Sequence, residues 1–184
     1  MRSYALKEAI DCLQSAGIVY KIHHTAASGI PLNTLLDLNK YKLFFLDVGL
    51  VTVKSGLSAK VLMDKEILLL NRGEIAEQFV CQELLANRSY FKKPELYYWS
   101  RPEKTSTAEV DFVIQQEDKI IPIEVKAGST GQLKSLKIMM QEKKLPIGVR
   151  ISQKKLSYES EKKIISIPLY MVSEIGRLVG DYFK

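Results

Sequence analysis

The residues most able to do chemistry are two acids and a lysine within two short apolar segments. The first segment, 109–114, contains Asp111; the second, 120–126, contains Glu124 and ends at Lys126. Both have the β-branched and aromatic content of strands, and a polar stretch of hairpin length separates them. Because side chains alternate along a strand, Glu124 and Lys126 share one face.

The turn between these segments sets which acids meet. If Glu117 and Asp118 are its two central residues, Asp111 lies directly across from Glu124. Two carboxylates at such paired positions, with Cβ atoms roughly 4.5–5.5 Å apart, repel each other. A hard divalent cation with oxygen ligands would relieve that repulsion, so the pattern indicates a metal site.

Other registers lead to different conclusions. A shift by two residues places Glu109 across from Glu124 and leaves a similar acidic cluster. A shift by one puts Asp111 and Glu124 on opposite faces and removes the site. A solvated strand face with a Glu109–Lys126 ion pair, which adds little stability at a surface, is the simpler interpretation.

These residues also carry a resemblance. Asp111, followed by Glu124-Val125-Lys126 at the end of an apolar strand, resembles the core signature of the PD-(D/E)xK nuclease superfamily. The resemblance implies that Asp111 and Glu124 hold Mg²⁺ (or Mn²⁺), with the carbonyl of Val125 as a third oxygen. It implies that Lys126 positions or deprotonates the attacking water. The activity implied is metal-assisted hydrolysis of phosphodiester bonds, with DNA as the expected substrate.

A helix expected before the hairpin supplies a fourth residue. The segment from Gly73 to Val80 resembles the superfamily's preceding helix, in which a Glu one turn after a Gly faces the metal. This implies that Glu77 completes the metal shell through a water. At about 100° per residue, Glu77 also lies at the border of the buried helix face. Glu83 lies within the apolar arc and is the competing candidate.

The order of the motifs resembles one group in particular, the uncharacterised nuclease-like C-terminal domain of prokaryotic AAA-class ATPases. The segments 42–50, 97–99 and 167–170 fit it as well as the helix and hairpin do, so the resemblance covers most of the chain. It implies an AAA-class ATPase domain N-terminal to this segment. The sequence has no Gly-x-x-x-x-Gly-Lys-Ser/Thr phosphate loop, so we expect the chain to be the C-terminal part of a longer protein. The alternative function is a catalytically silent module that binds nucleic acid or a partner and regulates the ATPase.

Hydrophobic periodicity predicts alternating strands and helices after residue 70. The expected helices are 4–16, 72–88, 131–143 and 169–182. The expected strands are 18–22, 95–100, 107–115, 119–126, 147–151 and 163–167, together with an apolar strand that passes into a turn within 43–53. We expect a loop at 25–40 and short helical pieces at 57–70. The fold class predicted is α/β, with a restriction-endonuclease-like core in which helices flank a mixed sheet, plus a small N-terminal helical extension. Residues 1–40 would be the end of a linking helical module, and 41–184 the nuclease-like domain.

Composition agrees with a globular domain. The chain has 184 residues, 46% of them hydrophobic and 26% charged, and its net charge of +6 mildly favours a polyanionic partner. A basic stretch would contact phosphates in a nuclease or else simply solvate a helix; it comprises Lys134, Lys137, Lys143, Lys144, Lys154 and Lys155. The sequence has neither a membrane-spanning apolar run nor a signal peptide, so we expect a cytoplasmic setting without a membrane partner. Nothing in it indicates an oligomeric state.

Three aromatic residues and two histidines are weaker candidates. Tyr97, Tyr98 and Trp99 would stack on bases if exposed, but a strand through the core buries some of them, and we expect two of the three to be buried. His23 and His24 are neighbours on a strand and point to opposite faces, so we expect surface residues rather than a metal clamp.

Overall fold

The computed structural model describes residues 3–54, 72–87, 91, 95–101, 108–128 and 132–183, and an eight-stranded mixed sheet forms its centre. The strands are β1 (Val19–Thr25), β2 (Leu36–Phe45), β3 (Tyr97–Ser100), β4 (Glu109–Gln116), β5 (Lys119–Val125), β6 (Gly148–Ser152), β7 (Ser157–Glu159) and β8 (Ile164–Pro168). Their order across the sheet is β2-β1-β3-β4-β5-β6-β8-β7. The β1–β3, β5–β6 and β6–β8 pairs are parallel and the others antiparallel. The predicted α/β class with a mixed sheet is confirmed.

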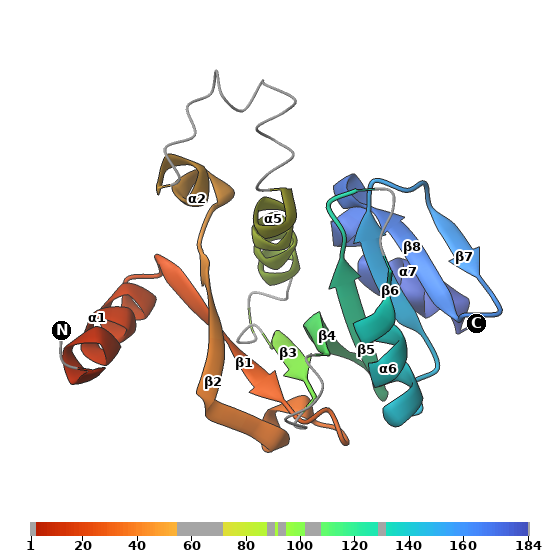
Figure 1. Ribbon diagram of the computed structural model, residues 1–184, viewed down its shortest axis with the longest axis horizontal. Coiled ribbons are helices and arrows are strands. Elements are labelled where there is room, and N and C mark those ends of the chain that lie inside the picture. Colours follow the sequence, from red (N-terminus) through yellow and green to blue (C-terminus); the bar gives the residue numbers. More distant parts are fainter. Residues whose placement is uncertain are drawn as a thin grey trace.

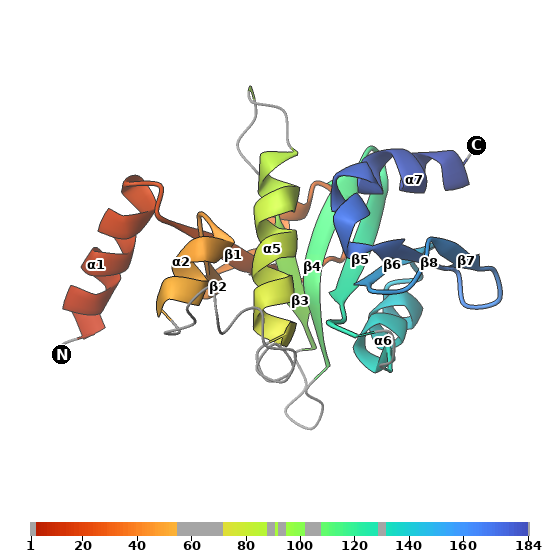
Figure 2. The same ribbon diagram turned by 90° about the horizontal axis from the view of Figure 1, so that it is seen from above.

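Helices pack on both faces of this sheet. The α-helices are α1 (Ser3–Ser15), α2 (Val48–Lys54), α5 (Arg72–Ala86), α6 (Lys134–Glu142) and α7 (Ile175–Tyr182), and the 3₁₀ helices are η1 (Leu32–Leu35) and η2 (Leu169–Glu174). Figure 2 shows α6 and α7 on opposite sides of strands β5 to β8. Among the residues described, no helix is both long enough and apolar enough to cross a membrane.

Two apolar clusters, one on each side of the sheet, hold these layers together. Phe112 and Ile123 from the hairpin pack with Val80 of α5 and Val179 of α7 in the first cluster. In the second, which lies under α6, Val110 and Val113 join a set that includes Trp99, Leu136 and Met139. The hairpin β4–β5 contributes side chains to both clusters, so it is anchored from both faces.

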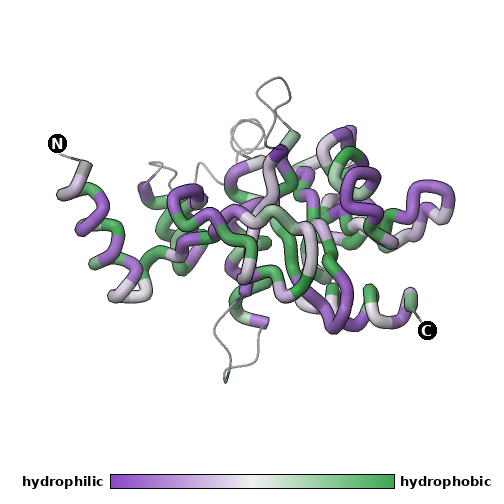
Figure 3. The backbone as a smooth tube through the Cα atoms, turned by 90° about the horizontal axis from the view of Figure 1, so that it is seen from below, coloured by the Kyte–Doolittle hydropathy of each residue, from purple (hydrophilic) through white to green (hydrophobic). Residues whose placement is uncertain are grey.

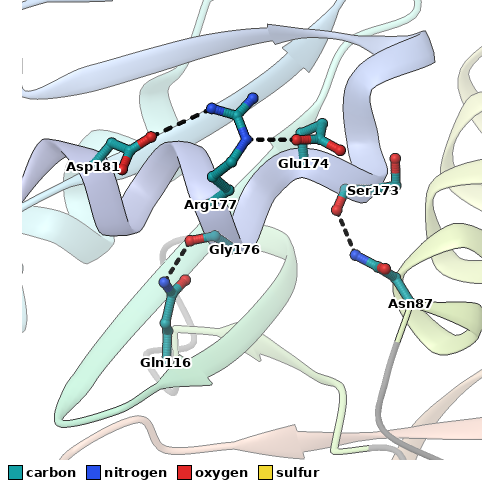
Figure 4. Close-up of polar contacts among 7 residues, drawn as sticks. All are labelled: Asn87, Gln116, Ser173, Glu174, Gly176, Arg177 and Asp181. Atoms are coloured by element: carbon teal, nitrogen blue, oxygen red, sulfur yellow. Dashed lines mark hydrogen bonds and ion pairs between the residues drawn. The ribbon is translucent and has the colours of Figure 1, made fainter.

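The closing helix is tied to the hairpin and to α5 by polar contacts (Figure 4). Gln116 Nε2, at the end of β4, donates a hydrogen bond of 2.6 Å to the carbonyl oxygen of Gly176. Asn87 Nδ2, just after α5, donates to the carbonyl oxygen of Ser173. Arg177 in turn bonds to an acid on either side of it along the chain. These bonds join the turn end of the hairpin to α7, and the end of α5 to η2.

The N-terminal helix lies at the far end of the molecule from the C-terminus (Figure 1). Hydrophilic and hydrophobic residues alternate along it (Figure 3), and Leu6 and Leu13 are among its exposed apolar side chains. Gly17, with φ of 71°, ends the helix in the left-handed conformation that glycine readily adopts after the last helical turn.

Two sequence predictions between residues 25 and 53 were wrong. The expected loop at 25–40 ends at Leu36, where strand β2 begins. Because β2 is an edge strand, several of its residues are polar and exposed, and this composition is also typical of a loop. The expected strand at 43–53 ends at Phe45 and is followed by α2. Asp47 Oδ1 accepts a 2.7 Å hydrogen bond from the backbone N–H of Gly49, which favours a helix start over a continued strand. The helical pieces expected at 57–70 lie outside the described residues.

Smaller differences occur near the C-terminus. The edge strand β7 was not predicted, because three exposed or partly exposed residues carry no apolar alternation. The closing helix expected at 169–182 divides into η2 and α7, with non-helical backbone angles at Met171.

The domain boundary predicted at residue 40 falls inside β2, and the sheet extends across it. The division into residues 1–40 and 41–184 itself stays a prediction.

Candidate functional site

The hairpin has the register on which the candidate site depends. Phe112 pairs with Ile123, and Gln116 with Lys119 at the turn end, so Glu117 and the residue after it are the central turn residues. Glu117 has φ of 53°, the positive value that tight hairpin turns need. The register prediction is therefore confirmed. The next position beyond the paired ladder brings Asp111 and Glu124 to the same end of the hairpin.

A β-bulge lies in β4 at this end. Tyr97 of β3 pairs with Val113, but Trp99 pairs with Val110, so β4 carries one more residue than β3 over this stretch. Bulges bend a strand and re-aim a side chain. The direction of the Asp111 side chain, which lies in the bulged stretch, is therefore not set by simple alternation.

A hydrogen bond instead fixes where Asp111 reaches. Its Oδ2 accepts a bond of 2.8 Å from the backbone N–H of Val125, the last residue of β5. The carboxylate thus lies against the end of β5, where Glu124 and Lys126 flank Val125.

Glu124 is the most buried of the candidate acids. Only 4% of it is exposed, and its Oε1 lies 2.7 Å from Nζ of Lys126. Its Oε2 is buried and has no hydrogen-bond partner among the described residues. An orphaned carboxylate oxygen is costly to bury, and a ligand is one explanation for it.

Lys42 is a site residue that the sequence analysis missed. This β2 lysine places its Nζ 2.5 Å from Oε1 of Glu109 and 5.2 Å from the centre of the Tyr98 ring. The Glu109–Lys126 pair considered from the sequence is thus replaced by Glu109–Lys42. The only available signal was a lysine in a strand-like segment, and its contact depends on pairing between distant parts of the chain.

The acids perturb one another's protonation. Burial and then the charge of Asp111 raise the pKa of Glu77 to about 7, although Lys42 opposes the rise. Burial and Asp111 likewise raise the pKa of Glu124 to about 7, against the stabilising contact with Lys126. Burial is the larger cause of each raised pKa, and repulsion by Asp111 adds to it.

Burial and nearby charges also act in opposite directions on the pKa values of Asp111 and Lys42. Burial raises the pKa of Asp111, and its bond from Val125 and the nearby lysines only partly offset this. Burial would lower the pKa of Lys42, but its bond to Glu109 and the surrounding acids outweigh burial and raise it. The structure therefore brings Glu77, Asp111, Glu124 and Lys126 into one electrostatic cluster, to which Lys42 and Glu109 also belong.

Part of the cluster faces a groove on the α5 side. A groove of about 610 Å³ lies between β2, α2 and the start of α5, and Lys42 and Glu77 are on its wall. Glu83, the competing candidate, is partly buried and lies six residues further along α5 than Glu77.

The described part of the chain contains no group of three or more His, Cys, Asp or Glu side chains close enough together to hold a metal ion. The oxygen donors at the hairpin end are accordingly two carboxylates, Asp111 and Glu124, with the main chain at Val125 beside them. Glu77 lies within electrostatic range but not within such a group.

The weaker candidates are more buried than predicted. Tyr97, Tyr98 and Trp99 are all buried, one more than expected, so they belong to the core. His23 and His24 are partly buried rather than on the surface, and His24 Nε2 lies 3.2 Å from the carbonyl oxygen of Ser100.

Fold and site together describe an α/β protein with an acidic cluster at one end of a central hairpin. The family model described as "Domain of unknown function (DUF4143)" matches residues 72–170, more than half of the chain, and the chain belongs to this family. The matched region runs from α5 to η2 and contains Glu77, Asp111, Glu124 and Lys126, whereas Lys42 lies outside it. No curated protein and no solved structure matches the chain significantly.

Proposed function

We propose that the chain has a PD-(D/E)xK nuclease-like core and hydrolyses phosphodiester bonds in DNA with the help of Mg²⁺ or Mn²⁺. The observation that carries the proposal is the meeting of Asp111 with the Glu124–Lys126 pair at one end of the hairpin, joined by the hydrogen bond to Val125. Two acids and a lysine in this arrangement have the residue types that hydrolysis of a phosphodiester requires.

The donor set fits a hard cation. Asp111, Glu124 and the carbonyl of Val125 would supply oxygen ligands, and Glu77 would contribute through a water. Oε2 of Glu124 has no hydrogen bond to lose, so a cation there would relieve both its burial and its repulsion by Asp111. A bound Mg²⁺ would polarise the phosphate and lower the pKa of a coordinated water.

The other side chains would orient and balance charge. Lys126 already holds Oε1 of Glu124 and would offset negative charge as the attacked phosphate gains it. Glu77, with a pKa of about 7, is poised to accept a proton near neutral pH. Lys42 would keep Glu109 neutralised beside the site.

The test combines metal binding with cleavage. Calorimetry at pH 7.5 should detect Mg²⁺ or Mn²⁺ binding that is lost in Asp111→Asn and Glu124→Gln but kept in Glu83→Gln, a matched change on α5. Supercoiled, linear and single-stranded DNA should be cut by the unaltered chain, and at least a hundredfold more slowly by Lys126→Gln. Lys7→Gln, an exposed lysine on α1 outside both the cluster and the basic stretch, is its control. Absence of both binding and cleavage would refute the proposal.

A second candidate is a silent module that binds DNA or a partner while an N-terminal AAA-class ATPase domain does the work. The absence of a three-residue metal group among the described residues favours this candidate. DNA binding without cleavage, unaffected by Asp111→Asn, would support it.

A further inference from the structure

On the α6 side of the sheet, three neighbouring strands carry a row of buried polar residues that begins at Glu124 of the acidic cluster. Glu124 of β5 pairs with Arg150 of β6, and Arg150 pairs with Ser166 of β8. Each has a buried side-chain atom without a hydrogen-bond partner among the described residues: Oε2 of Glu124, Nη1 of Arg150 and Oγ of Ser166. Buried polar atoms are rarely left unpaired. Oε2 of Glu124 is an acceptor that belongs to the acidic cluster, whereas the Arg150 guanidinium is a donor and lines a pocket.

Arg150 connects this row to a basic pocket. The pocket has a volume of about 360 Å³ and lies beside the start of α6, which packs against β6 (Figure 1). Its lining residues are Gln132, Leu133, Lys134, Lys137, Arg150 and Lys162. Four of these six residues are basic.

Arg150 is nine-tenths buried, with 9% of the residue exposed, yet its pairing is incomplete. Glu159 is the acid that contacts it, but their nearest atoms, Nη1 and Oε1, are 3.7 Å apart, which is too long for a hydrogen bond. Glu159 makes its short contact elsewhere, with Lys162 at 2.5 Å. A buried guanidinium left in this state has strong donors to offer to an anion.

The start of α6 adds to the attraction for negative charge. Leu133 is the N-cap residue of α6, and its apolar side chain cannot accept a hydrogen bond from the first backbone N–H groups of the helix. Lys134 and Lys137 are three residues apart and therefore lie on the same side of α6. Both are exposed, so a ligand reaching Arg150 would meet them at the mouth of the pocket.

We propose that this pocket binds a phosphate group through Arg150 and the lysines around it. The planar guanidinium suits two phosphate oxygens at once, and the lysines add charge without fixing geometry. Arg150 and Glu124 are paired on adjacent strands, about 4.8 Å apart, so the pocket lies on the same side of the sheet as Glu124. The inference rests on the proposed function only in taking a nucleic-acid backbone as the main source of that phosphate.

The first arm of the test measures inorganic phosphate and pyrophosphate binding to the full chain by NMR titration, in EDTA and at constant ionic strength. We expect Arg150→Gln to weaken binding at least tenfold and Arg150→Lys to weaken it less, because the charge remains but the fork is lost. Lys7→Gln on α1 removes the same charge far from the pocket and should leave binding within about twofold.

Because Arg150 is buried, substituting it can disturb folding, so the test also uses a variant in which only exposed residues change. The double variant Lys134→Gln/Lys137→Gln changes only exposed residues and should also weaken phosphate binding about tenfold. Equal binding by this double variant, by Arg150→Lys and by Lys7→Gln would overturn the proposal.

The second arm uses a short single-stranded DNA oligonucleotide under the same metal-free conditions. Weaker oligonucleotide binding in the pocket variants identifies a backbone phosphate, whereas an effect on inorganic phosphate alone identifies a small phosphate ligand. Either result supports the site. Asp111→Asn should still bind phosphate. Phosphate binding therefore tests the pocket separately from the hydrolysis proposal, and either one can fail without the other.

Discussion

The backbone N–H of Val125 donates its hydrogen bond to Oδ2 of Asp111 at 2.8 Å, across the open end of the β4–β5 hairpin. The Asp111 side chain therefore takes the place of a ladder bond where the bulge in β4 ends regular pairing. The same carboxylate repels Glu124 and Glu77 and raises the pKa of both. Asp111 thus stabilises the backbone through its hydrogen bond, and its negative charge disfavours the charged forms of Glu77 and Glu124.

These two effects are separable by substitution at Asp111. Asp111→Asn keeps an oxygen acceptor for Val125 and removes the charge, whereas Asp111→Ala removes both. We expect Asp111→Ala to be less stable than Asp111→Asn by about 1–3 kcal/mol at pH 7.5, because a buried N–H loses its partner. Urea denaturation of the two variants measures this difference. Equal midpoints would mean that the hydrogen bond contributes nothing.

The raised pKa of Glu77 makes stability depend on pH. A carboxyl whose pKa rises from 4.5 to about 7 on folding binds more protons in the folded state between those values, so it costs stability as pH rises through that window. Relative to Glu77→Gln, the unaltered chain should lose on the order of 2 kcal/mol between pH 4.5 and pH 7 and little more above. Chemical denaturation of both proteins at several pH values isolates the contribution of Glu77. A constant difference across the series would contradict it.

Much of the site follows from local sequence because a hairpin is a local structure. Alternating apolar residues and a polar turn fix the register, which in turn brings Asp111 towards Glu124. Glu77 was proposed largely from the resemblance of its helix to that of the nuclease superfamily, supported by its place at the border of a helix face. The bulge at Asp111 was not predicted, because it arises from pairing with β3 and leaves no local pattern in β4.

The parts that were missed depend on contacts between distant segments. Lys42 belongs to an exposed edge strand whose polar residues resemble a loop, and its contact with Glu109 exists only once β2, β1, β3 and β4 assemble. Gln78 looked like an ordinary polar position in α5, yet it is 3% exposed and bonds to the main chain of Phe45. No periodicity in a single element could reveal either contact.

Lys42 should set the protonation of the acidic cluster. Its charge lowers the pKa of Glu77 and of Glu124, so Lys42→Gln should raise both further, by on the order of one unit. Lys42→Arg keeps the charge and should leave them nearer their original values. Carboxyl ¹³C NMR titration measures these values directly. Unchanged titrations in Lys42→Gln would exclude Lys42 from the cluster.

Gln78 should be important for stability. Its side chain accepts a 2.9 Å bond from the N–H of Phe45 and donates one of 2.7 Å to the carbonyl of the same residue. Gln78→Ala leaves both groups without this partner and should destabilise the fold by about 2–4 kcal/mol. Gln141→Ala, on an exposed turn of α6, is the matched control and should change stability by less than about 0.5 kcal/mol. Thermal and urea unfolding would show the contrast, and similar losses in the two variants would rule out the role given to Gln78.

The last prediction concerns competition between protons and metal ions for the same oxygens. Glu124 and Glu77 have pKa values of about 7, so both are largely protonated at pH 5 and largely charged at pH 8. A cation site built from these carboxylates must therefore strengthen as pH rises, since binding releases protons.

At pH 8, Mg²⁺ at about 100 times its dissociation constant should stabilise the domain by about 2.7 kcal/mol, or roughly 5–10 °C in melting temperature. At pH 5 the same Mg²⁺ concentration should shift the melting temperature by no more than about 2 °C. Differential scanning calorimetry at the two pH values, with calcium-free buffers and matched ionic strength, makes the comparison.

Three variants determine whether the effect comes from the acidic cluster. Asp111→Asn and Glu124→Gln should abolish the metal-dependent shift at pH 8, because each removes a proposed ligand charge. Glu83→Gln removes one acid from the same helix as Glu77 and should retain the full shift. A shift of equal size at pH 5 and pH 8, or one that survives in Asp111→Asn, would place any bound cation elsewhere on the protein and leave the hairpin acids without a metal to hold.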